Sequence, residues 1–224
     1  MKNLFALLFC AAAAWAQVAG TANQNYKTHA GREAVARGLA NPGRDAEQHP
    51  RELVEAMNLK PGMTVADVGT GVGYMLPYLS HAVGPGGRVL AEDIASDFLD
   101  KARLRAQTTN LHNVQFILGT SSDSKLPGGS VDAVLVLEVY HHFDYPAEML
   151  KSIREALVSD GRLYIVDYYK RPNAMPGGNA MQHIRLDEDD VAKEVEAHGF
   201  KEVGRRVQSP GHQYMLIFEK RTPE

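Results

Sequence analysis

Glycines stand at alternate positions in the stretch GTGVG, residues 69–73, directly after an apolar run at residues 64–68. A short apolar run that is rich in β-branched residues and closed by glycine predicts a buried strand. The glycines permit positive φ angles and let a ligand approach the backbone without meeting a Cβ atom. A helix that begins after Gly73 would point its free N–H groups at that ligand. The stretch therefore predicts a site for a nucleotide-like or carboxylate-bearing ligand, with a tight turn that binds nothing as the alternative.

Carboxylates stand at the ends of two predicted strands. Asp67 lies two residues before the first glycine, and Glu92-Asp93-Ile94 ends a second predicted strand. This second strand ends about twenty residues after the glycine turn, where a carboxylate accepts hydrogen bonds from both hydroxyls of a ribose. Because adjacent residues of a strand point to opposite faces, only one of Glu92 and Asp93 can take this role.

The stretch MTVADVGTGVGYMLPYL, residues 63–79, resembles motif I of class I S-adenosylmethionine (SAM)-dependent methyltransferases. The dinucleotide fingerprint G-x-G-x-x-G would need a glycine where this chain has Tyr74. Together with AEDI, VYHHF and the apolar N-terminus, the stretch resembles a group of exported bacterial predicted methyltransferases. The resemblance covers about residues 44–220. It implies SAM as the cofactor and a doubly wound, Rossmann-like α/β sheet of seven strands in the order 3-2-1-4-5-7-6, with a C-terminal antiparallel hairpin.

The resemblance also implies which residues bind the cofactor. Asp93 fits the family pattern better than Glu92, because an apolar residue that packs on adenine, here Ile94, follows the carboxylate. A carboxylate that faces the adenine amino group corresponds to Asp123, for which an exposed loop aspartate is the alternative. The segment GRDAEQHP, residues 43–50, resembles a segment that covers the methionine end of the cofactor, although helix capping and surface polarity explain its polar residues equally well. The expected cofactor-binding residues are Asp67, Gly69, Thr70, Gly71, Gly73, Asp93, Ile94, Ser122, Asp123 and Glu138.

The candidates for chemistry on a methyl acceptor follow a nearly continuous apolar run at residues 131–139, which predicts a central parallel strand. In open α/β sheets ligands lie beyond the carboxyl ends of the strands, so the sequence YHHF at residues 140–143 should border the pocket. An imidazole has a near-neutral pKa that suits a base. The candidates, in order of preference, are His142, His141 and Tyr140, followed by Tyr169 or His183. A packed or surface pair of histidines is the alternative.

No metal site is predicted. Adjacent histidines are expected to point apart, and the sequence offers no cysteine or H-x-x-x-H partner near His141 and His142.

Five predicted strands alternate with helices and are followed by a hairpin. Right-handed crossovers then require a doubly wound sheet. The strands are expected at residues 64–68, 88–93, 114–118, 131–139 and 162–167, and the hairpin at 200–208 and 213–220. A long loop at residues 173–185 follows the fifth strand and is predicted to be a lid over the acceptor.

The N-terminus has the pattern of a secretory signal peptide. Lys2 precedes an apolar run, and Ala14-Trp15-Ala16 is a small-x-small cleavage site. The predicted organisation is a signal peptide at residues 1–16, a partly ordered lead-in at 17–44 and a methyltransferase domain at 45–224. The protein is therefore expected to be exported, to the periplasm, and to lose its only cysteine, Cys10, on cleavage.

Composition limits the partners. A net charge of −3 and a pI near 6.3 give no basic surface for nucleic acid or an anionic membrane. The expected partner is a small-molecule acceptor, with no membrane association after signal cleavage. Two other functions stay open: a non-catalytic SAM- or nucleotide-binding protein of the same fold, and an NAD-type Rossmann oxidoreductase.

Overall fold

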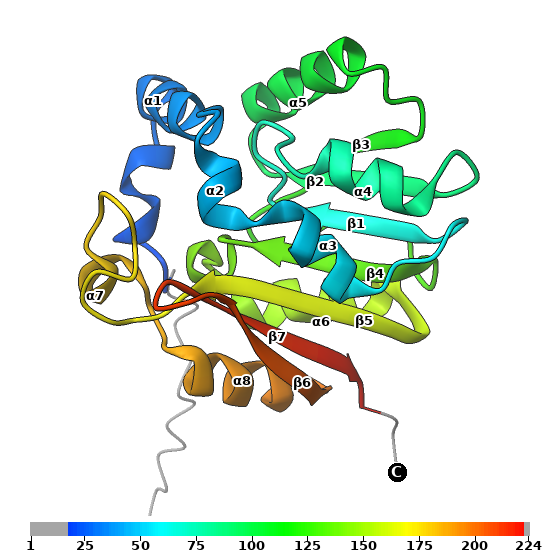
Figure 1. Cartoon of the computed structure of the whole chain (residues 1–224). Helices are drawn as coiled ribbons and strands as arrows, with labels where there is room; N and C mark the ends of the chain where they lie inside the picture. The colour runs from blue at the N-terminus through cyan, green and yellow to red at the C-terminus, as the bar shows by residue number, and fades with distance from the viewer. Residues whose placement is uncertain (1–17, 222–224) are drawn as a thin grey trace, which may run out of the picture.

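The computed structural model describes residues 18–221, so the predicted signal peptide lies outside the described residues. Seven strands form one sheet in the order β3-β2-β1-β4-β5-β7-β6, which confirms the predicted fold class (Figure 1). The first five strands are parallel, and β7 runs antiparallel to both β5 and β6. The strands are β1 (Thr64–Val68), β2 (Arg88–Asp93), β3 (Val114–Leu118), β4 (Val131–Leu137), β5 (Leu157–Tyr168), β6 (Phe200–Ser209) and β7 (Gln213–Lys220).

Helices cover both faces of the sheet. They are α1 (His29–Leu39), α2 (Arg44–Gln48), α3 (Pro50–Met57), α4 (Leu76–Val83), α5 (Ser96–Thr108), α6 (Pro146–Ala156), α7 (Ala180–His183) and α8 (Glu188–Ala197), with short 3₁₀ turns η1 (Ala22–Tyr26) and η2 (Tyr140–His142). No described helix is both long and apolar enough to cross a lipid bilayer.

Alternate residues of each central strand enter different cores. In β1, Val65 packs with the buried residues of α3 and α4, whereas Ala66 packs with those of α6 and α8. In β4, Leu135 and Val136 divide between the two cores in the same way. Because both faces of these strands are covered, their sequences are apolar throughout instead of alternating with polar residues.

Two strand boundaries differ from the prediction by two residues or more. β4 ends at Leu137, two residues early, because Glu138 has a left-handed backbone with a φ of 55°. β5 begins at Leu157, which pairs with Val131 of β4, so the preceding helix α6 ends sooner than its periodicity suggests.

The lead-in before residue 44 contains the 3₁₀ turn η1 and the helix α1. The side chain of Thr28 accepts a hydrogen bond from the N–H of Gly31 and caps α1. Ala36 of α1 then packs against Val72 and Phe98. The segment therefore lies at the edge where the parallel strands end (Figure 1, blue). Its polar composition hid this, because few apolar side chains are needed to dock so short a helix.

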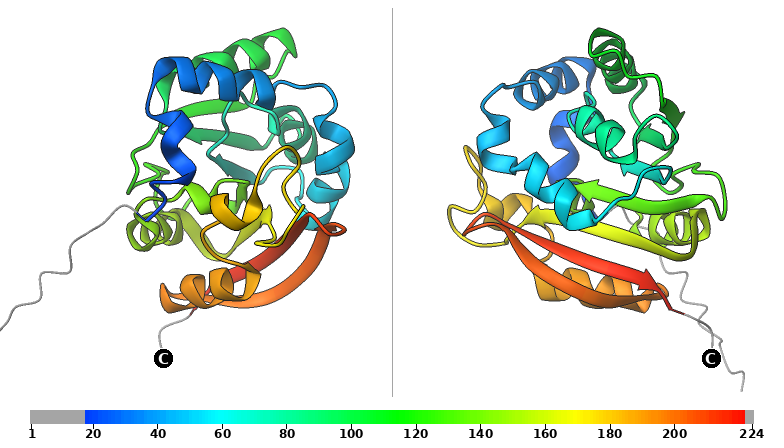
Figure 2. Two further views of the ribbon diagram at one scale, coloured as in Figure 1. Left: turned by 90° about the vertical axis from the view of Figure 1, so that its left-hand side faces the viewer. Right: turned by 45° about the vertical axis from the view of Figure 1, so that its right-hand side comes forward.

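The long loop between β5 and α8 lies on the same edge. It includes α7, and it buries Ala174 and Ala180. The left view of Figure 2 looks onto this edge and shows the lead-in helices and the loop together. Segments from the two ends of the chain thus flank the carboxyl ends of the central strands.

Candidate active site

The glycine turn adopts the backbone that its sequence predicts. Gly69, Gly71 and Gly73 have φ angles of 72°, 56° and 77°. A Cβ on Gly69 would lie 2.5 Å from a methyl carbon of Val139, and one on Gly73 would lie 2.8 Å from a methyl carbon of Leu76. Both positions therefore require glycine for packing as well as for conformation. Gly73 does not line the cavity described next, so its predicted contact with a cofactor is replaced by a packing role.

A cavity of about 470 Å³ opens between the glycine turn, the end of β2 and the lead-in helices. The lead-in contributes Asn23, Tyr26, Arg32 and Arg44 to its wall. The predicted site residues that line it are Asp67, Gly69, Thr70, Gly71, Asp93, Ile94, Glu138 and His142. The predicted residues outside the lining are Gly73, Ser122, Asp123, Tyr140, His141, Tyr169 and His183.

Asp93 holds the glycine turn and remains able to bind a ligand. Its Oδ2 accepts a hydrogen bond of 2.9 Å from the N–H of Gly71, and its Oδ1 accepts one of 2.9 Å from the N–H of Ala95. Each carboxylate oxygen has a second lone pair, which is available to a ribose hydroxyl. Burial raises the pKa of Asp93 to about 6.

Glu92 also lines the cavity. Its Oε2 accepts a hydrogen bond of 3.3 Å from the N–H of Gly69, and its Oε1 has no partner among residues 18–221. Burial raises the pKa of Glu92 well above its usual value, and the nearby charge of Asp93 adds to this effect. Asp67 accepts a hydrogen bond of 2.7 Å from the hydroxyl of Thr70, and burial raises its pKa to about 6. Three buried carboxyl groups thus surround the glycine turn.

The structure corrects the prediction for the loop after β3. Asp123 forms an ion pair of 2.5 Å with Lys125 at the surface, and Thr120 pairs with Asp123 across a tight turn. Lys125 lowers the pKa of Asp123 through this contact. The turn carries Ser122 and Asp123 away from the cavity and leaves Ser121 at its wall. The surroundings of Asp123 are therefore those of an exposed loop aspartate, the alternative given for this residue.

Glu138 connects the sheet to the lead-in. Its two oxygens accept hydrogen bonds of 2.8 Å from Arg44, 2.5 Å from Gln48 and 2.7 Å from Gln213. The guanidinium of Arg44 also lies 4.4 Å from the ring centre of Tyr74. Glu138 has a positive φ, which is a strained backbone conformation for a non-glycine residue, and such residues concentrate at functional sites. The segment GRDAEQHP carried the only sequence signal for this arrangement.

The three acceptor-side candidates have different surroundings. Tyr140 is 1% exposed, its hydroxyl donates a hydrogen bond of 2.6 Å to Glu194, and it does not line the cavity. His141 is buried, and its Nδ1 lies 2.8 Å from Oδ1 of Asp167. His142 alone borders the cavity. Burial lowers the pKa of His142 well below its usual value, and the neighbouring His141 and His183 lower it further.

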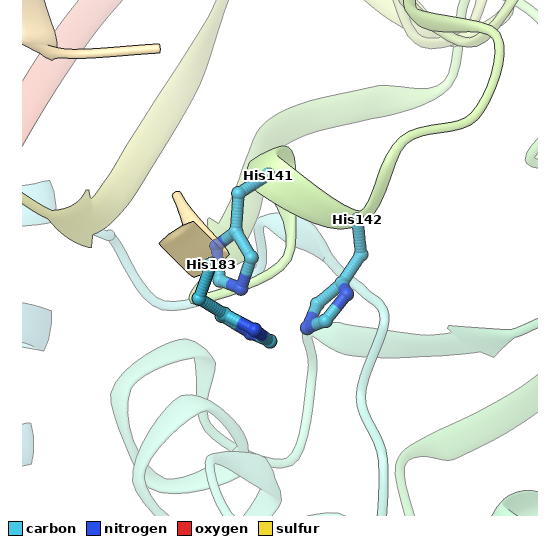
Figure 3. Close-up of side chains that lie close together, drawn as sticks. All are labelled: His141, His142 and His183. Atoms are coloured by element: carbon cyan, nitrogen blue, oxygen red, sulfur yellow. The ribbon is translucent and has the colours of Figure 1, made fainter. Parts of the chain in front are cut away.

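The two adjacent histidines do not point apart. Their ring centres are 4.1 Å from each other, and those of His141 and His142 lie 5.0 Å and 5.4 Å from that of His183 (Figure 3). The expectation assumed strand geometry, in which neighbours point to opposite faces. Residues 140–142 instead form the 3₁₀ turn η2, in which successive side chains are about 120° apart. His183 comes from the loop and is close only in the folded chain.

Comparison with known proteins agrees with this geometry. Residues 66–165 match the family described as "Methyltransferase domain". A SAM-dependent methyltransferase from Aquifex aeolicus superposes with a TM-score of 0.77 at 26% identity, over 83% of this chain and 96% of that one. The ubiquinone/menaquinone biosynthesis C-methyltransferase of Pseudomonas fluorescens is 27% identical over 56% of this chain and 49% of its own length. The nocamycin O-methyltransferase of Saccharothrix syringae is 34% identical over 50% and 40%.

Residues 66–165 thus match the methyltransferase domain family, and the sheet has the strand order of class I SAM-dependent methyltransferases, whose cofactor is SAM. The chain spans less than half of the length of the two curated relatives named above. The cavity fits the cofactor chemically. Buried carboxylates line it, which suits a cationic ligand, and each carboxylate oxygen of Asp93 keeps a lone pair for a ribose hydroxyl.

Replacing Asp67 by asparagine should change how stability depends on pH. Between pH 4 and 6 the native carboxyl keeps a proton that the unfolded chain releases, because its native pKa is about 6. As the pH rises from 4 to 6, the free energy of unfolding of the wild type should therefore fall by about 2–3 kcal/mol relative to that of Asp67→Asn. Urea titrations of the cofactor-free proteins measure this difference. Asp123→Asn is the matched control and should show a weak trend of opposite sign, because its native pKa is lowered. A difference for Asp67→Asn that does not vary with pH would contradict the prediction.

Replacing Asp93 by alanine should weaken SAM binding tenfold to a hundredfold. The two ribose hydroxyls lose a charged acceptor, whose hydrogen bonds contribute about 1.5–3 kcal/mol. Isothermal titration calorimetry with SAM measures the loss, and Asp123→Ala should bind as the wild type does because Asp123 lies outside the cavity. An unchanged dissociation constant for Asp93→Ala would refute the assignment of the ribose site.

Proposed function

We propose that this protein transfers a methyl group from SAM to a small-molecule acceptor, and that His142 orients the acceptor or takes its proton. The observation that carries the proposal is the position of His142: among the acceptor-side candidates, it alone lines the cavity that also contains the glycine turn and Asp93. SAM supplies a methyl carbon that is already activated by a sulfonium, so the protein mainly has to align the reactants and exclude water.

The walls of the cavity favour a small, partly apolar acceptor. The ring of Tyr26 meets that of His142 edge to face at a centroid distance of 4.7 Å. Phe143 and Met149 continue the apolar lining on the same side. Aromatic and apolar side chains next to positioned polar groups are typical of small-molecule sites. The names of the two curated relatives, a ubiquinone/menaquinone biosynthesis C-methyltransferase and an O-methyltransferase for nocamycin, point in the same direction.

The lead-in helices provide the water exclusion that this chemistry needs. Arg32 donates to both carboxylate oxygens of Asp97 at 3.0 Å and 2.8 Å, which holds α1 against α5. Asn23 donates from its side-chain amide to the carbonyl of His142 at 3.0 Å. These contacts close the cavity from the side opposite the sheet.

Calorimetry with SAM, S-adenosylhomocysteine and NAD separates this function from its rivals. A methyltransferase binds the first two and not the third. A non-catalytic binder gives the same binding but forms no S-adenosylhomocysteine when a panel of phenols, quinols, amines and thiols is screened. Binding of NAD alone would favour the oxidoreductase.

Replacing His142 by alanine should reduce turnover of the identified acceptor about 10²–10⁴-fold, the usual contribution of a general base. The fold and SAM affinity should persist, because the glycine turn and Asp93 do not contact this ring. Tyr140→Phe is the matched control and should retain turnover, since its hydroxyl bonds to Glu194 outside the cavity. Full turnover in His142→Ala would refute the role. A loss of SAM affinity and melting temperature in step with turnover would assign His142 to structure instead.

Export to the periplasm is the second part of the proposal, supported by the charged start, the apolar run and the Ala14-Trp15-Ala16 site. Fractionation of the source cells and N-terminal sequencing of the mature protein should give cleavage after Ala16. Intact protein that begins at Met1 in the cytoplasm would contradict it.

A further inference from the structure

Three imidazole rings from two separate segments converge at the acceptor end of the cavity. One ring nitrogen from each of His141, His142 and His183 lies within 4.8 Å of the others (Figure 3). The first two residues belong to η2, and the third belongs to α7, about forty residues later in the chain. Histidine is the commonest nitrogen ligand for transition metals in proteins.

The hydrogen bonds of His142 leave its Nε2 free to bind a metal. Nδ1 of His142 lies 2.8 Å from Oδ1 of Asn23. The amide nitrogen of Asn23 donates to the backbone carbonyl of His142, so the oxygen of that amide must be the group that faces the ring. An amide oxygen only accepts, and Nδ1 of His142 therefore carries a hydrogen. In the neutral ring, Nε2 then has an unshared electron pair.

The same reasoning fixes His141. Its Nδ1 lies 2.8 Å and 2.9 Å from the two oxygens of Asp167, a residue that is 1% exposed. A carboxylate that accepts from Nδ1 of a histidine orients the ring and raises its basicity, which is the usual outer contact of a metal-bound histidine. Within residues 18–221, the recorded hydrogen bonds of both rings involve Nδ1, and none involves Nε2.

The third histidine can move to complete the set. Nitrogens that bind one tetrahedral ion at about 2.0–2.1 Å lie about 3.4 Å from each other, so ring nitrogens that are up to 4.8 Å apart must approach by up to about 1.4 Å. His183 is partly exposed and lies on a four-residue helix within a long loop, whereas His141 is fixed by Asp167. The required movement therefore falls on the loop that carries His183.

We propose that His141, His142 and His183 form a binding site for one divalent transition-metal ion, of which Zn²⁺ is the type. Three histidines with a fourth position left open are the ligand set of catalytic zinc sites, and imidazole ligands suit Zn²⁺, Cu²⁺ and Ni²⁺. Because His142 borders the cavity, the site adjoins the space for the acceptor.

The metal site also specifies the class of acceptor, and this part rests on the proposed methyl transfer. A hydroxyl or thiol bound to the ion would lose its proton to solvent near neutral pH, and its oxygen or sulfur would keep the electron pair. That pair would form the new bond to the methyl carbon of SAM, while the bond from this carbon to the sulfonium breaks, its electron pair goes to sulfur, and S-adenosylhomocysteine leaves. The ion and a proton would occupy the same Nε2 atom of His142, so in the metal-bound protein His142 acts as a ligand and not as the base. The acceptor is then a compound with an ionisable O–H or S–H group.

Titration of the tag-free, full-length protein with Zn²⁺ in a calorimeter tests the site without using SAM. The wild type should bind one ion, and Co²⁺ in its place should give the visible absorption of a tetrahedral complex. His183→Ala should weaken Zn²⁺ binding about 100-fold, because it leaves two ligands. Asn23→Ala should weaken it about 10–100-fold through the lost orientation of His142. His112→Ala removes an exposed histidine just before β3, outside the three-histidine cluster, and should leave Zn²⁺ binding unchanged.

Two results would overturn the site: no stoichiometric Zn²⁺ binding by the wild type, or equal binding by the wild type and His183→Ala. SAM affinity, measured on the same samples, keeps this outcome distinct from the proposed function. A protein that binds Zn²⁺ at the three histidines but not SAM retains the metal site and loses the methyltransferase proposal. A protein that binds SAM but not Zn²⁺ keeps the methyltransferase proposal and loses the metal site. For a protein that binds both ligands, turnover is measured with Zn²⁺ present and again after Zn²⁺ is removed. Equal turnover in the two measurements would overturn the activation of the acceptor by the metal.

Discussion

The hydrogen bonds between the glycine turn and the end of β2 are the constraint on which this site depends. The N–H groups of Gly69 and Gly71 donate to the carboxylates of Glu92 and Asp93, and the N–H of Thr70 donates to the carbonyl of Glu92 at 2.8 Å. The glycines adopt positive φ angles, which would be unfavourable for most other residues. These contacts define the floor of the cavity before any cofactor binds.

This arrangement has an electrostatic cost that the function explains. Asp67, Glu92 and Asp93 are buried within the same turn, and burial raises the pKa of each carboxyl group. Charging these groups in the empty protein is unfavourable because they lose their hydration. A cationic cofactor offsets that cost, so ligand binding and ionisation should favour each other. The energy that the fold loses in this region is consistent with selection for binding instead of stability.

The acceptor end is assembled differently, from segments that meet only in the folded chain. Glu138 bonds to Arg44 and Gln48 of the lead-in and to Gln213 of β7, which ties three distant segments together beside the cavity. Asn23 orients His142 in the same way, from a segment well before the sheet. The cofactor end is therefore local in sequence, whereas the acceptor end depends on long-range contacts. Substrate specificity can change through the lead-in and the loop without altering the glycine turn.

The sequence alone determined the doubly wound sheet, the glycine turn and the carboxylate of Asp93, and the strand order followed from the family resemblance. These features depend on short-range patterns: apolar runs for strands covered on both faces, and glycines where the backbone needs positive φ. The tertiary structure decided the rest. A tight turn moved Asp123 to Lys125 at the surface, and a buried bond to Glu194 removed Tyr140 from the site. The convergence of His183 with the two adjacent histidines required both the 3₁₀ turn and the return of a distant loop, and no spacing along the chain encodes that contact.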